Sequence, residues 1–327
     1  MNDTKTPKIF VTRRLPGLHL DRLRGVADVT VWPDSMPPSR DDLLAGVAQC
    51  DGLLTLLSDR IDASVMDAAG PNLKVISNYA VGYNNIDVAA AGARGIRVGN
   101  TPDVLTDATA DLAVTLLLAA ARRVREAANQ VQTGGWKTWE PTGLLGIEPA
   151  GKTLGVIGMG RIGKAFARRM VGGWNMPLLY TSRTVQDDVD ESLGGRHVDL
   201  DELLAQSDFI SVHVALCDAT AGLLDADAFS RMKDGVVIVN TARGEIINQD
   251  ALLDGLNSQK VFAAGLDVTS PEPLPHEHPL VRHPRTIILP HIGSATDRSR
   301  NAMAEIAVDN VLHGLRGESL RCEVNLA

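Results

Sequence analysis

Residues 155–165 read GVIGMGRIGKA, and this stretch decides the fold of the chain. Gly158, Gly160 and Gly163 fit the spacing G-x-G-x-x-G, with a strand-like run before them and a helix-like segment after them. In such a unit the first glycine allows a tight turn, the second lets the backbone approach a pyrophosphate, and the third permits close packing of helix on strand. Amides at the start of the helix then hold the anion. The stretch therefore predicts a dinucleotide-binding turn.

The end of the next strand indicates which dinucleotide binds. NAD-binding chains usually carry Asp or Glu there, because a carboxylate binds the ribose hydroxyls. This chain reads YTSRT instead, so no carboxylate repels a 2'-phosphate, and Arg183 offers fork-like donors beside the hydroxyls of Ser182 and Thr184. We therefore predict a preference for NADPH, with NADH as the alternative cofactor. The competing interpretation is that Arg183 is a solvated surface residue and that Asp187 or Asp188 curls back to the ribose.

Along the rest of the chain, short apolar runs alternate with helical stretches, which favours parallel sheets. The first hundred residues contain the strand-like runs KIFVT, VTVW, GLLTLL, KVIS and IRVG and the helix-like runs VMDAAG and IDVAAAGARG. The series that begins at Lys152 contains the strand-like runs TLGVIG, PLLYT, DFISVHV, GVVIVNTA, VFAAGLDV and TIILP and the final helix-like stretch ATDRSRNAMAEIAVDNVLHGLRG. A chain of 327 residues with two such series predicts two domains.

Two segments of different character join the series. DVLTDATADLAVTLLLAAARRVREAANQV carries apolar residues at helical spacing, which predicts one long helix leading from the first domain to the second. QTGGWKTWEPTGLLGIEPAGKT follows, and its content of Gly, Pro and Trp predicts an irregular excursion. Trp136 and Trp139 within it form either a packing patch or part of an interface.

Composition and charge limit the classes of protein. With 44% hydrophobic, 22% charged and 4% aromatic residues, the composition is that of an α/β protein. Forty acidic and 32 basic residues give a net charge of -8 without a dense basic run, so neither nucleic acid nor a membrane is an expected partner. The start of the chain has no long apolar core, and Cys50, Cys217 and Cys322 are widely spaced, so we expect free thiols in a cytoplasmic protein.

Ionisable residues follow three successive strands of the second series. Arg243 follows VVIVNTA, Asp267 and Glu272 follow FAAGL, and His291 follows TIILP. Ligands of open parallel sheets bind beyond the carboxyl ends of the strands. Hydride transfer to a 2-oxo acid needs a proton donor for the developing alkoxide and a cation for the carboxylate, which suit His291 and Arg243. Glu272 would orient His291 and favour its charged form.

Metal chemistry is not expected. His276 and His278 lie in the proline-bounded stretch LPHEHPL, and the cysteines form no CxxC pair. Both patterns favour ordinary loop and core residues over metal ligands.

With these residues in place, the chain resembles the D-isomer-specific 2-hydroxyacid dehydrogenase family over essentially its whole length. NYAVGYNNID, TPDVLTDATADLA, GMGRIG, NTARGEIIN, GLDVTSPEP and PHIGSAT look like the family's blocks, in the right order. The resemblance implies two doubly wound parallel-sheet domains, with a Rossmann cofactor domain (102–294) inserted in a flavodoxin-like substrate domain (1–101 with 295–327) and the active site in the cleft. It also implies a homodimer formed through the cofactor domains.

The family's site residues carry over block by block. The resemblance implies that Arg243 binds the substrate, that His291 is the acid/base with Glu272 as its partner, and that the amides of Val81 and Gly82 receive the substrate carboxylate. It assigns to the cofactor Thr106, Gly158, Gly160, Arg161, Ile162, Gly163, Ser182, Arg183, Thr184, Ala242, Asp267, His291 and Gly293.

Within the family, NYAVGYNNID, WKTWEP and YTSR look like the glyoxylate and hydroxypyruvate reductases. This similarity implies NADPH-dependent reduction of glyoxylate to glycolate and of hydroxypyruvate to D-glycerate, with Trp139 shaping the pocket from the partner subunit. HVALCDAT departs from the pattern, because Ala215 and Cys217 stand where many relatives carry Pro and Thr. That departure puts the adenine-side loop in doubt but leaves the chemistry unchanged.

Two alternatives stay open. One is another D-2-hydroxyacid dehydrogenase: the phosphoglycerate type normally uses NAD and carries a regulatory extension, which we expect to be absent here, and the phosphite type places Lys where this chain has Val81. The other is a non-catalytic dinucleotide-sensing corepressor, for which the sequence shows no disordered tail or basic arm.

Overall fold

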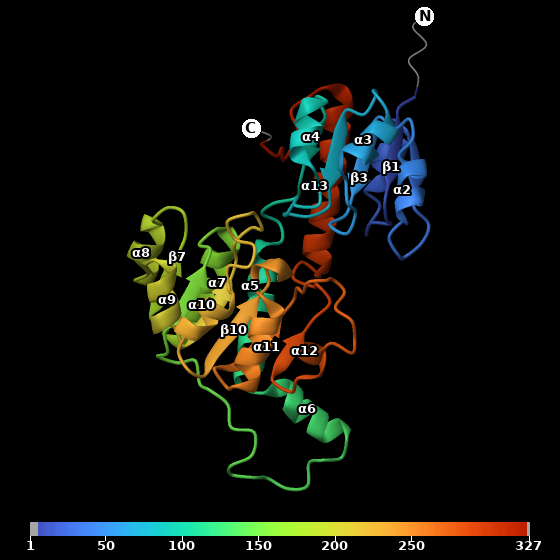
Figure 1. Cartoon of the computed structure of the whole chain (residues 1–327). Coiled ribbons are helices and arrows are strands. Elements are labelled where there is room, and N and C mark those ends of the chain that lie inside the picture. The colour runs from blue at the N-terminus through green and yellow to red at the C-terminus, as the bar shows by residue number, and fades with distance from the viewer. Residues whose placement is uncertain (1–5, 326–327) are drawn as a thin grey trace, which may run out of the picture. The chain divides into compact units, whose positions relative to one another are not determined.

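The computed structural model describes residues 6–325, and its contacts divide the chain into two units. The first unit comprises residues 1–105 and 295–327, and the second comprises residues 106–294. Each unit is an α/β fold built on one parallel sheet (Figure 1). The predicted fold class, a Rossmann domain together with a second doubly wound domain, is confirmed.

The sheet of the first unit has the flavodoxin-like strand order β2-β1-β3-β4-β5. Its strands are β1 (Lys8–Val11), β2 (Asp28–Val31), β3 (Gly52–Thr55), β4 (Val75–Asn78) and β5 (Arg97–Gly99). Its helices are α1 (Leu20–Arg24), α2 (Arg40–Gly46), α3 (Ala63–Ala69), α4 (Val88–Ala93) and α13 (Asp297–Arg316). The helices α2, α3 and α4 bury apolar side chains against one face, while α13 packs against β3 and β4 beside α1.

The sheet of the second unit has the order β12-β11-β10-β9-β6-β7-β8. Its strands are β6 (Leu154–Ile157), β7 (Leu178–Thr181), β8 (Arg196–His197), β9 (Phe209–Val212), β10 (Val236–Asn240), β11 (Val261–Leu266) and β12 (Thr286–Ile288). Because β6 pairs with both β7 and β9, the strand order reverses there, and such a switch point is where ligands of this fold bind. The two-residue β8 escaped prediction, because it is too short to show a pattern.

Helices cover both faces of this second sheet. The helices of this unit are α5 (Thr106–Ala121), α6 (Val124–Gln132), α7 (Arg161–Trp174), α8 (Asp187–Leu193), α9 (Leu200–Gln206), α10 (Ala226–Arg231), α11 (Gln249–Asn257) and α12 (Pro279–Arg282), with a 3₁₀ turn η1 (Gly244–Ile246), and α6 buries no side chain. One core cluster joins α5, α7 and α8 to the sheet, and another joins α9, α10 and α11 to the opposite face (Figure 1).

The single long helix expected after residue 102 is wrong, because two helices occupy that stretch. Arg123, between α5 and α6, adopts the left-handed conformation with φ 54°, which no α-helix continues through. Its guanidinium pairs with Glu126 at 2.6 Å in the first turn of α6. Side-chain periodicity continues across the break, so the sequence pattern did not reveal it.

Residues 133–153, which we call the excursion, contain neither helix nor strand, as predicted. The excursion runs from α6 to β6 along a path away from the sheet (Figure 1). Trp136 and Trp139 are 65% and 79% exposed. Neither tryptophan therefore packs in the core of its own chain.

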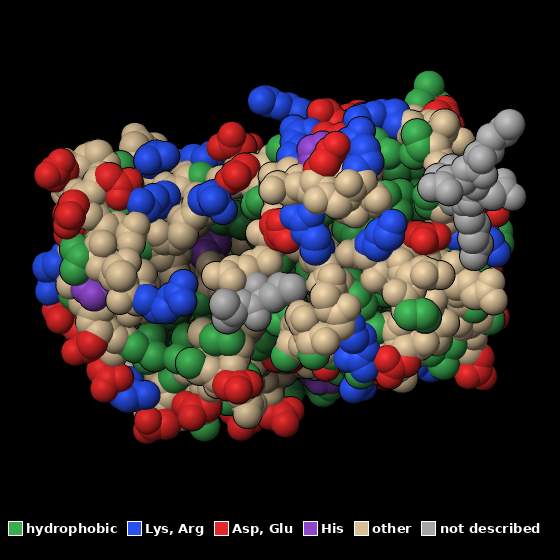
Figure 2. All heavy atoms as spheres, turned by 90° about the horizontal axis from the view of Figure 1, so that it is seen from above, with side chains coloured by type: hydrophobic (Ala, Val, Ile, Leu, Met, Phe, Trp, Pro, Cys, Tyr) green, Lys and Arg blue, Asp and Glu red, His purple; other side chains and the backbone are tan. Residues whose placement is uncertain are grey.

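Acidic and basic side chains are interspersed over the face shown in Figure 2. Ion pairs of the surface include Arg169–Asp111 and Arg231–Asp201. Within residues 6–325, no helix is long and apolar enough to cross a membrane.

Candidate active site

The glycine turn follows β6 directly. Gly158 has φ 99°, a conformation that favours glycine, and its amide donates to the carbonyl of Thr181 at 2.9 Å. A Cβ on Gly163 would lie 2.1 Å from the carbonyl oxygen of Gly158, so only glycine permits this close approach of helix and turn. A Cβ on Gly160 would meet open space at the start of α7. These residues fit a pyrophosphate held by the first amides of α7, where Arg161 and Ile162 begin the helix.

His213 lies beside this turn, at the end of β9. Its Nε2 is 2.8 Å from the hydroxyl of Ser211, and its ring packs against Phe166 with centroids 5.0 Å apart. Burial lowers the pKa of His213 to about 3, so the ring is neutral at physiological pH. His213 therefore packs beside the glycine turn as a neutral imidazole.

The segment after β7 presents Arg183 and Thr184 to solvent. The hydroxyl of Ser182 donates to the carbonyl of Thr184 at 2.7 Å, which closes this short turn. Asp188, in the first turn of α8, forms an ion pair with Lys164 of α7 at 2.6 Å. Asp187 and Asp188 are the two carboxylates that could bind the ribose in place of an acid at the end of β7, and this ion pair engages Asp188. Arg183 is the charged residue between β7 and α8.

His291 and Glu272 are brought together as a pair. Nδ1 of His291 is 2.5 Å from Oε1 of Glu272, and the two side chains are 22% and 33% exposed. Nε2, the other ring nitrogen, has no hydrogen-bond partner among residues 6–325. The two residues lie 19 positions apart in the sequence, and the ends of β11 and β12 place them next to each other.

Asp267 fixes the turn that carries His291. Its buried carboxylate accepts hydrogen bonds from the amides of Ile292 and Gly293, both at 2.7 Å, and its carbonyl accepts from the amide of His291 at 3.0 Å. His291 itself has φ 54°, a left-handed conformation that costs a residue with a side chain about 1–2 kcal/mol. The hydrogen bonds to Asp267 hold that conformation in place, so Asp267 orients the His291 turn.

Burial raises the pKa of Asp267, whereas the two amide hydrogen bonds and the nearby His291 act in the opposite direction. Gly293 completes the packing, because a Cβ there would lie 3.1 Å from this carboxylate and 3.3 Å from Thr109 of α5. Thr106, the first residue of α5, belongs to the same helix end.

Arg243 follows β10 and is half-buried. Burial lowers the pKa of its guanidinium, and the negative charges of Glu272 and Glu245 raise it. One guanidinium nitrogen donates to the carbonyl of Ala242 at 2.7 Å, and Asn240 binds both the amide of Ala242 and the carbonyl of Arg243. The charged group is thus held on a rigid turn at the same sheet edge as His291.

Two further residues, which the sequence did not predict, position the site. Asn240 is the last residue of the buried strand β10, and a polar residue at the end of an apolar run indicates a turn. Gln249, at the start of α11, holds both backbone groups of Ser270, at 2.5 and 3.0 Å, and so fixes the segment that leads to Glu272. Nothing in the sequence joins Gln249 to a segment 21 residues away.

The remaining predicted site residues lie elsewhere. Val81 and Gly82 are half-buried in the loop that follows β4 of the first unit. Trp139 is exposed in the excursion, outside the core clusters of its own chain. In the described part of the chain, no group of three or more His, Cys, Asp or Glu could hold a metal ion.

A glycine turn at a switch point and a His–Glu pair at the same sheet edge define an α/β oxidoreductase of the dinucleotide-binding class. Residues 114–293 match the family model for the NAD binding domain of the D-isomer specific 2-hydroxyacid dehydrogenases. The glyoxylate reductase/hydroxypyruvate reductase of Homo sapiens is 48% identical to the chain, over 100% of both sequences. The chain therefore belongs to the D-isomer specific 2-hydroxyacid dehydrogenase family and is an NAD(P)-dependent enzyme.

Solved structures agree with this assignment. A protein from Thermus thermophilus superimposes with a TM-score of 0.90 and 46% identity, covering 97% of this chain and 100% of that one. The NADPH-dependent glyoxylate/hydroxypyruvate reductase from Sinorhizobium meliloti, solved with NADP and malonate, has a TM-score of 0.83 and 31% identity over 98% of both chains.

Proposed function

We propose that the protein is an NADPH-preferring reductase that converts glyoxylate to glycolate and hydroxypyruvate to D-glycerate. The observation that carries the proposal is the His291–Glu272 pair at the sheet edge where Arg243 and the glycine turn also lie. The names of the relatives in Homo sapiens and Sinorhizobium meliloti support the same substrates. We place this activity in the reducing cytoplasm, because the three cysteines of the chain are widely spaced in the sequence.

Different residues of the chain donate the proton and bind the substrate during reduction. A nicotinamide dinucleotide bound at the glycine turn would supply a hydride to C2 of the substrate. Because Nδ1 of His291 faces Glu272, Nε2 donates the proton to the developing alkoxide, and the carboxylate stabilises the imidazolium before transfer. Arg243 binds the substrate carboxylate through charge-assisted hydrogen bonds, and the amides of Val81 and Gly82 add further donors.

The preference for NADPH rests on the turn after β7. Arg183 is exposed there, and Ser182 and Thr184 place hydroxyl groups beside it. A guanidinium with neighbouring hydroxyls binds a phosphate monoester, whereas an NAD site usually carries a carboxylate at this position.

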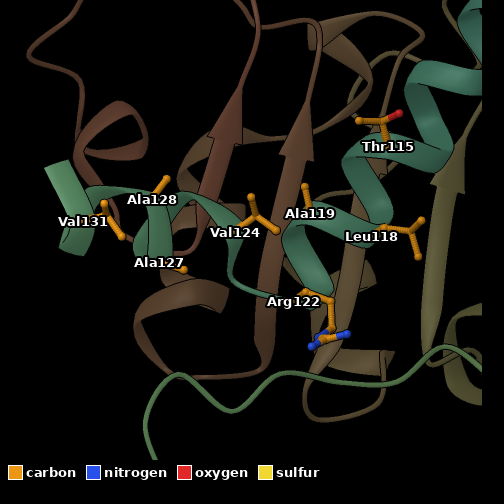
Figure 3. A pocket seen from close by; sticks show the side chains of 8 residues that line it. All are labelled: Thr115, Leu118, Ala119, Arg122, Val124, Ala127, Ala128 and Val131. Atoms are coloured by element: carbon orange, nitrogen blue, oxygen red, sulfur yellow. The ribbon is translucent and has the colours of Figure 1, made fainter. Parts of the chain in front are cut away.

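The proposed homodimer uses the second unit. Side chains of α5 and α6 line an open apolar groove of about 770 Å³ (Figure 3). Its lining residues include Leu118, Ala119, Ala127, Ala128 and Val131. The excursion, with its exposed tryptophans, continues directly from α6. A second copy of the chain would cover both surfaces and present Trp139 to its partner's substrate.

The two alternatives make different demands. A phosphoglycerate or phosphite dehydrogenase would act on those substrates in preference to glyoxylate, and a dinucleotide-sensing corepressor would need no proton donor. The closely paired His291 and Glu272 favour catalysis over sensing.

The variants His291→Ala and Glu272→Gln test the chemistry. We expect His291→Ala to lower kcat for glyoxylate by about 10²- to 10⁴-fold, because it removes the proton donor, and Glu272→Gln to lower it less. His276→Ala is the matched control, since His276 is a loop histidine that is 82% exposed beside Glu277. Turnover by His291→Ala close to that of wild type, with NADPH still bound, would refute the assigned role.

A further inference from the structure

The loop after β4 is held by its carbonyl groups. The carbonyl of Ala80 accepts from the amide of Thr101 at 2.9 Å, and that of Val81 accepts from Nδ2 of Asn100 at 2.8 Å. The carbonyl of Gly82 accepts from Nδ2 of Asn78 at 2.9 Å. Three consecutive carbonyl groups are thus bound by donors of the same unit.

In a trans peptide the carbonyl and the following N–H point in opposite directions. Each donor therefore turns the N–H of the next residue away from itself, which concerns Val81, Gly82 and Tyr83. Among the described residues, none of these three amides donates a hydrogen bond to the protein. Val81 and Gly82 are half-buried and Tyr83 is exposed, so the amides remain available to a ligand. Successive backbone amides without an acceptor in the protein are a known source of anion-binding sites.

Asn78 is built into a buried network. Its side chain is fully buried at the end of β4, its Oδ1 accepts from Thr55 at 3.1 Å, and its Nδ2 also donates to Asn85 at 3.0 Å. Asn85 in turn donates to the carbonyls of Leu56 and Asp59, both at 3.0 Å. Because a buried amide is costly unless its groups are paired, this network fixes the direction of the bond to Gly82.

Asn100 is fixed from the other side. Its amide donates to the carbonyl of Cys322 at 3.1 Å, and its carbonyl accepts from Asn310 of α13 at 3.0 Å. Oδ1 of Asn310 accepts from the amide of Cys322 at 2.9 Å. The backbone at Asn100 is therefore held by the C-terminal helix and the segment after it, while its side chain holds Val81.

We propose that Asn78 and Asn100 are positioning residues that set the amides of Val81, Gly82 and Tyr83 as one carboxylate-binding site. This inference rests on the proposed function, in which the amides of Val81 and Gly82 receive the substrate carboxylate. It adds the third amide, of Tyr83, and the two asparagines, whose side chains act on the substrate only through backbone carbonyls.

The test compares Asn100→Ala with Tyr79→Phe, and uses Asn78→Ala as the second variant. Tyr79→Phe is a matched control, because the Tyr79 hydroxyl donates to the carbonyl of Arg300 at 2.7 Å from the same loop without touching the carbonyls of residues 80–82. Steady-state rates with glyoxylate would be measured with each enzyme, together with the Kd of NADPH and the Kd of oxalate, a non-reacting dicarboxylate, for the enzyme–NADPH complex.

We expect each asparagine variant to raise KM for glyoxylate and the Kd of oxalate by about tenfold, because the loss of one side-chain hydrogen bond leaves the loop amides less well oriented toward the carboxylate. The Kd of NADPH should be unchanged and kcat should change much less than KM, whereas Tyr79→Phe should leave all four quantities near wild type. Unchanged oxalate binding in Asn100→Ala and Asn78→Ala would overturn the inference, and so would an equal rise in Tyr79→Phe. A wild-type enzyme that does not reduce glyoxylate would instead refute the proposed function.

Discussion

We propose that Arg183 determines the preference for NADPH over NADH. We predict that Arg183→Ala combined with Thr181→Asp lowers the NADPH to NADH ratio of kcat/KM by about ten- to a hundredfold, because one change removes a phosphate-binding cation and the other adds a ribose-binding carboxylate. Only the side chain of Thr181 changes, so the hydrogen bond from the glycine turn to its carbonyl is retained. Initial rates at equal cofactor concentrations give the ratio.

Arg196→Ala provides the control for a lost surface arginine nearby, since Arg196 lies on β8 and pairs with Glu202. That variant should keep the wild-type ratio. If the double variant also keeps the wild-type ratio of kcat/KM, the segment after β7 does not bind the 2'-phosphate.

The sequence predicted that Arg243, Glu272 and His291 lie at one sheet edge, for a physical reason. Arg243, Glu272 and His291 each follow a buried strand, and the carboxyl ends of parallel strands meet at one sheet edge. The supporting contacts were not predictable in the same way. The amides that bind Asp267 and the carbonyls that bind Asn78 and Asn100 are fixed by loop conformations, which side-chain patterns do not encode.

At the scale of elements, the turn after β12 depends on Asp267. We predict that Asp267→Asn lowers kcat by about ten- to a hundredfold, because an amide side chain has a single acceptor for two backbone N–H groups and a small displacement of His291 is costly. Rates with glyoxylate under saturating NADPH measure the effect.

Asp250→Asn, an exposed change in the first turn of α11, is the matched control and should retain wild-type kcat. Wild-type turnover by Asp267→Asn would show that the His291 turn keeps its conformation without the carboxylate.

Elements with long apolar runs were predicted correctly from the sequence. The prediction failed where the backbone conformation of a single residue ends a helix. Every strand of the second sheet except β8 was predicted from its apolar run. The left-handed Arg123 divides the expected long helix into α5 and α6, although the apolar spacing continues through it. The backbone conformation of one residue does not alter the spacing of apolar residues, so the hydrophobic pattern does not reveal it.

At the scale of the whole molecule, the groove between α5 and α6 belongs to the proposed dimer. We predict that Val131→Glu, which places a charge in this groove, shifts the protein from dimer to monomer and lowers glyoxylate reduction. Light scattering coupled to gel filtration measures the mass. Val26→Glu is the control, because Val26 is also a half-exposed valine but lies after α1 in the first unit. Equal masses for wild type and Val131→Glu would place any dimer contact elsewhere.

Two parallel sheets were predictable at this scale because alternating strands and helices admit few topologies. The strand orders that the structure shows for the two sheets are those of doubly wound folds.

We propose that the wild-type protein is an NADPH-preferring reductase of small 2-oxo acids. Initial rates of NADPH and NADH consumption with glyoxylate, at equal cofactor concentrations, test it most directly. We predict rapid turnover with NADPH and a lower kcat/KM with NADH. No glyoxylate-dependent consumption of either cofactor would contradict the assigned reaction, and a higher kcat/KM with NADH would contradict the assigned cofactor preference.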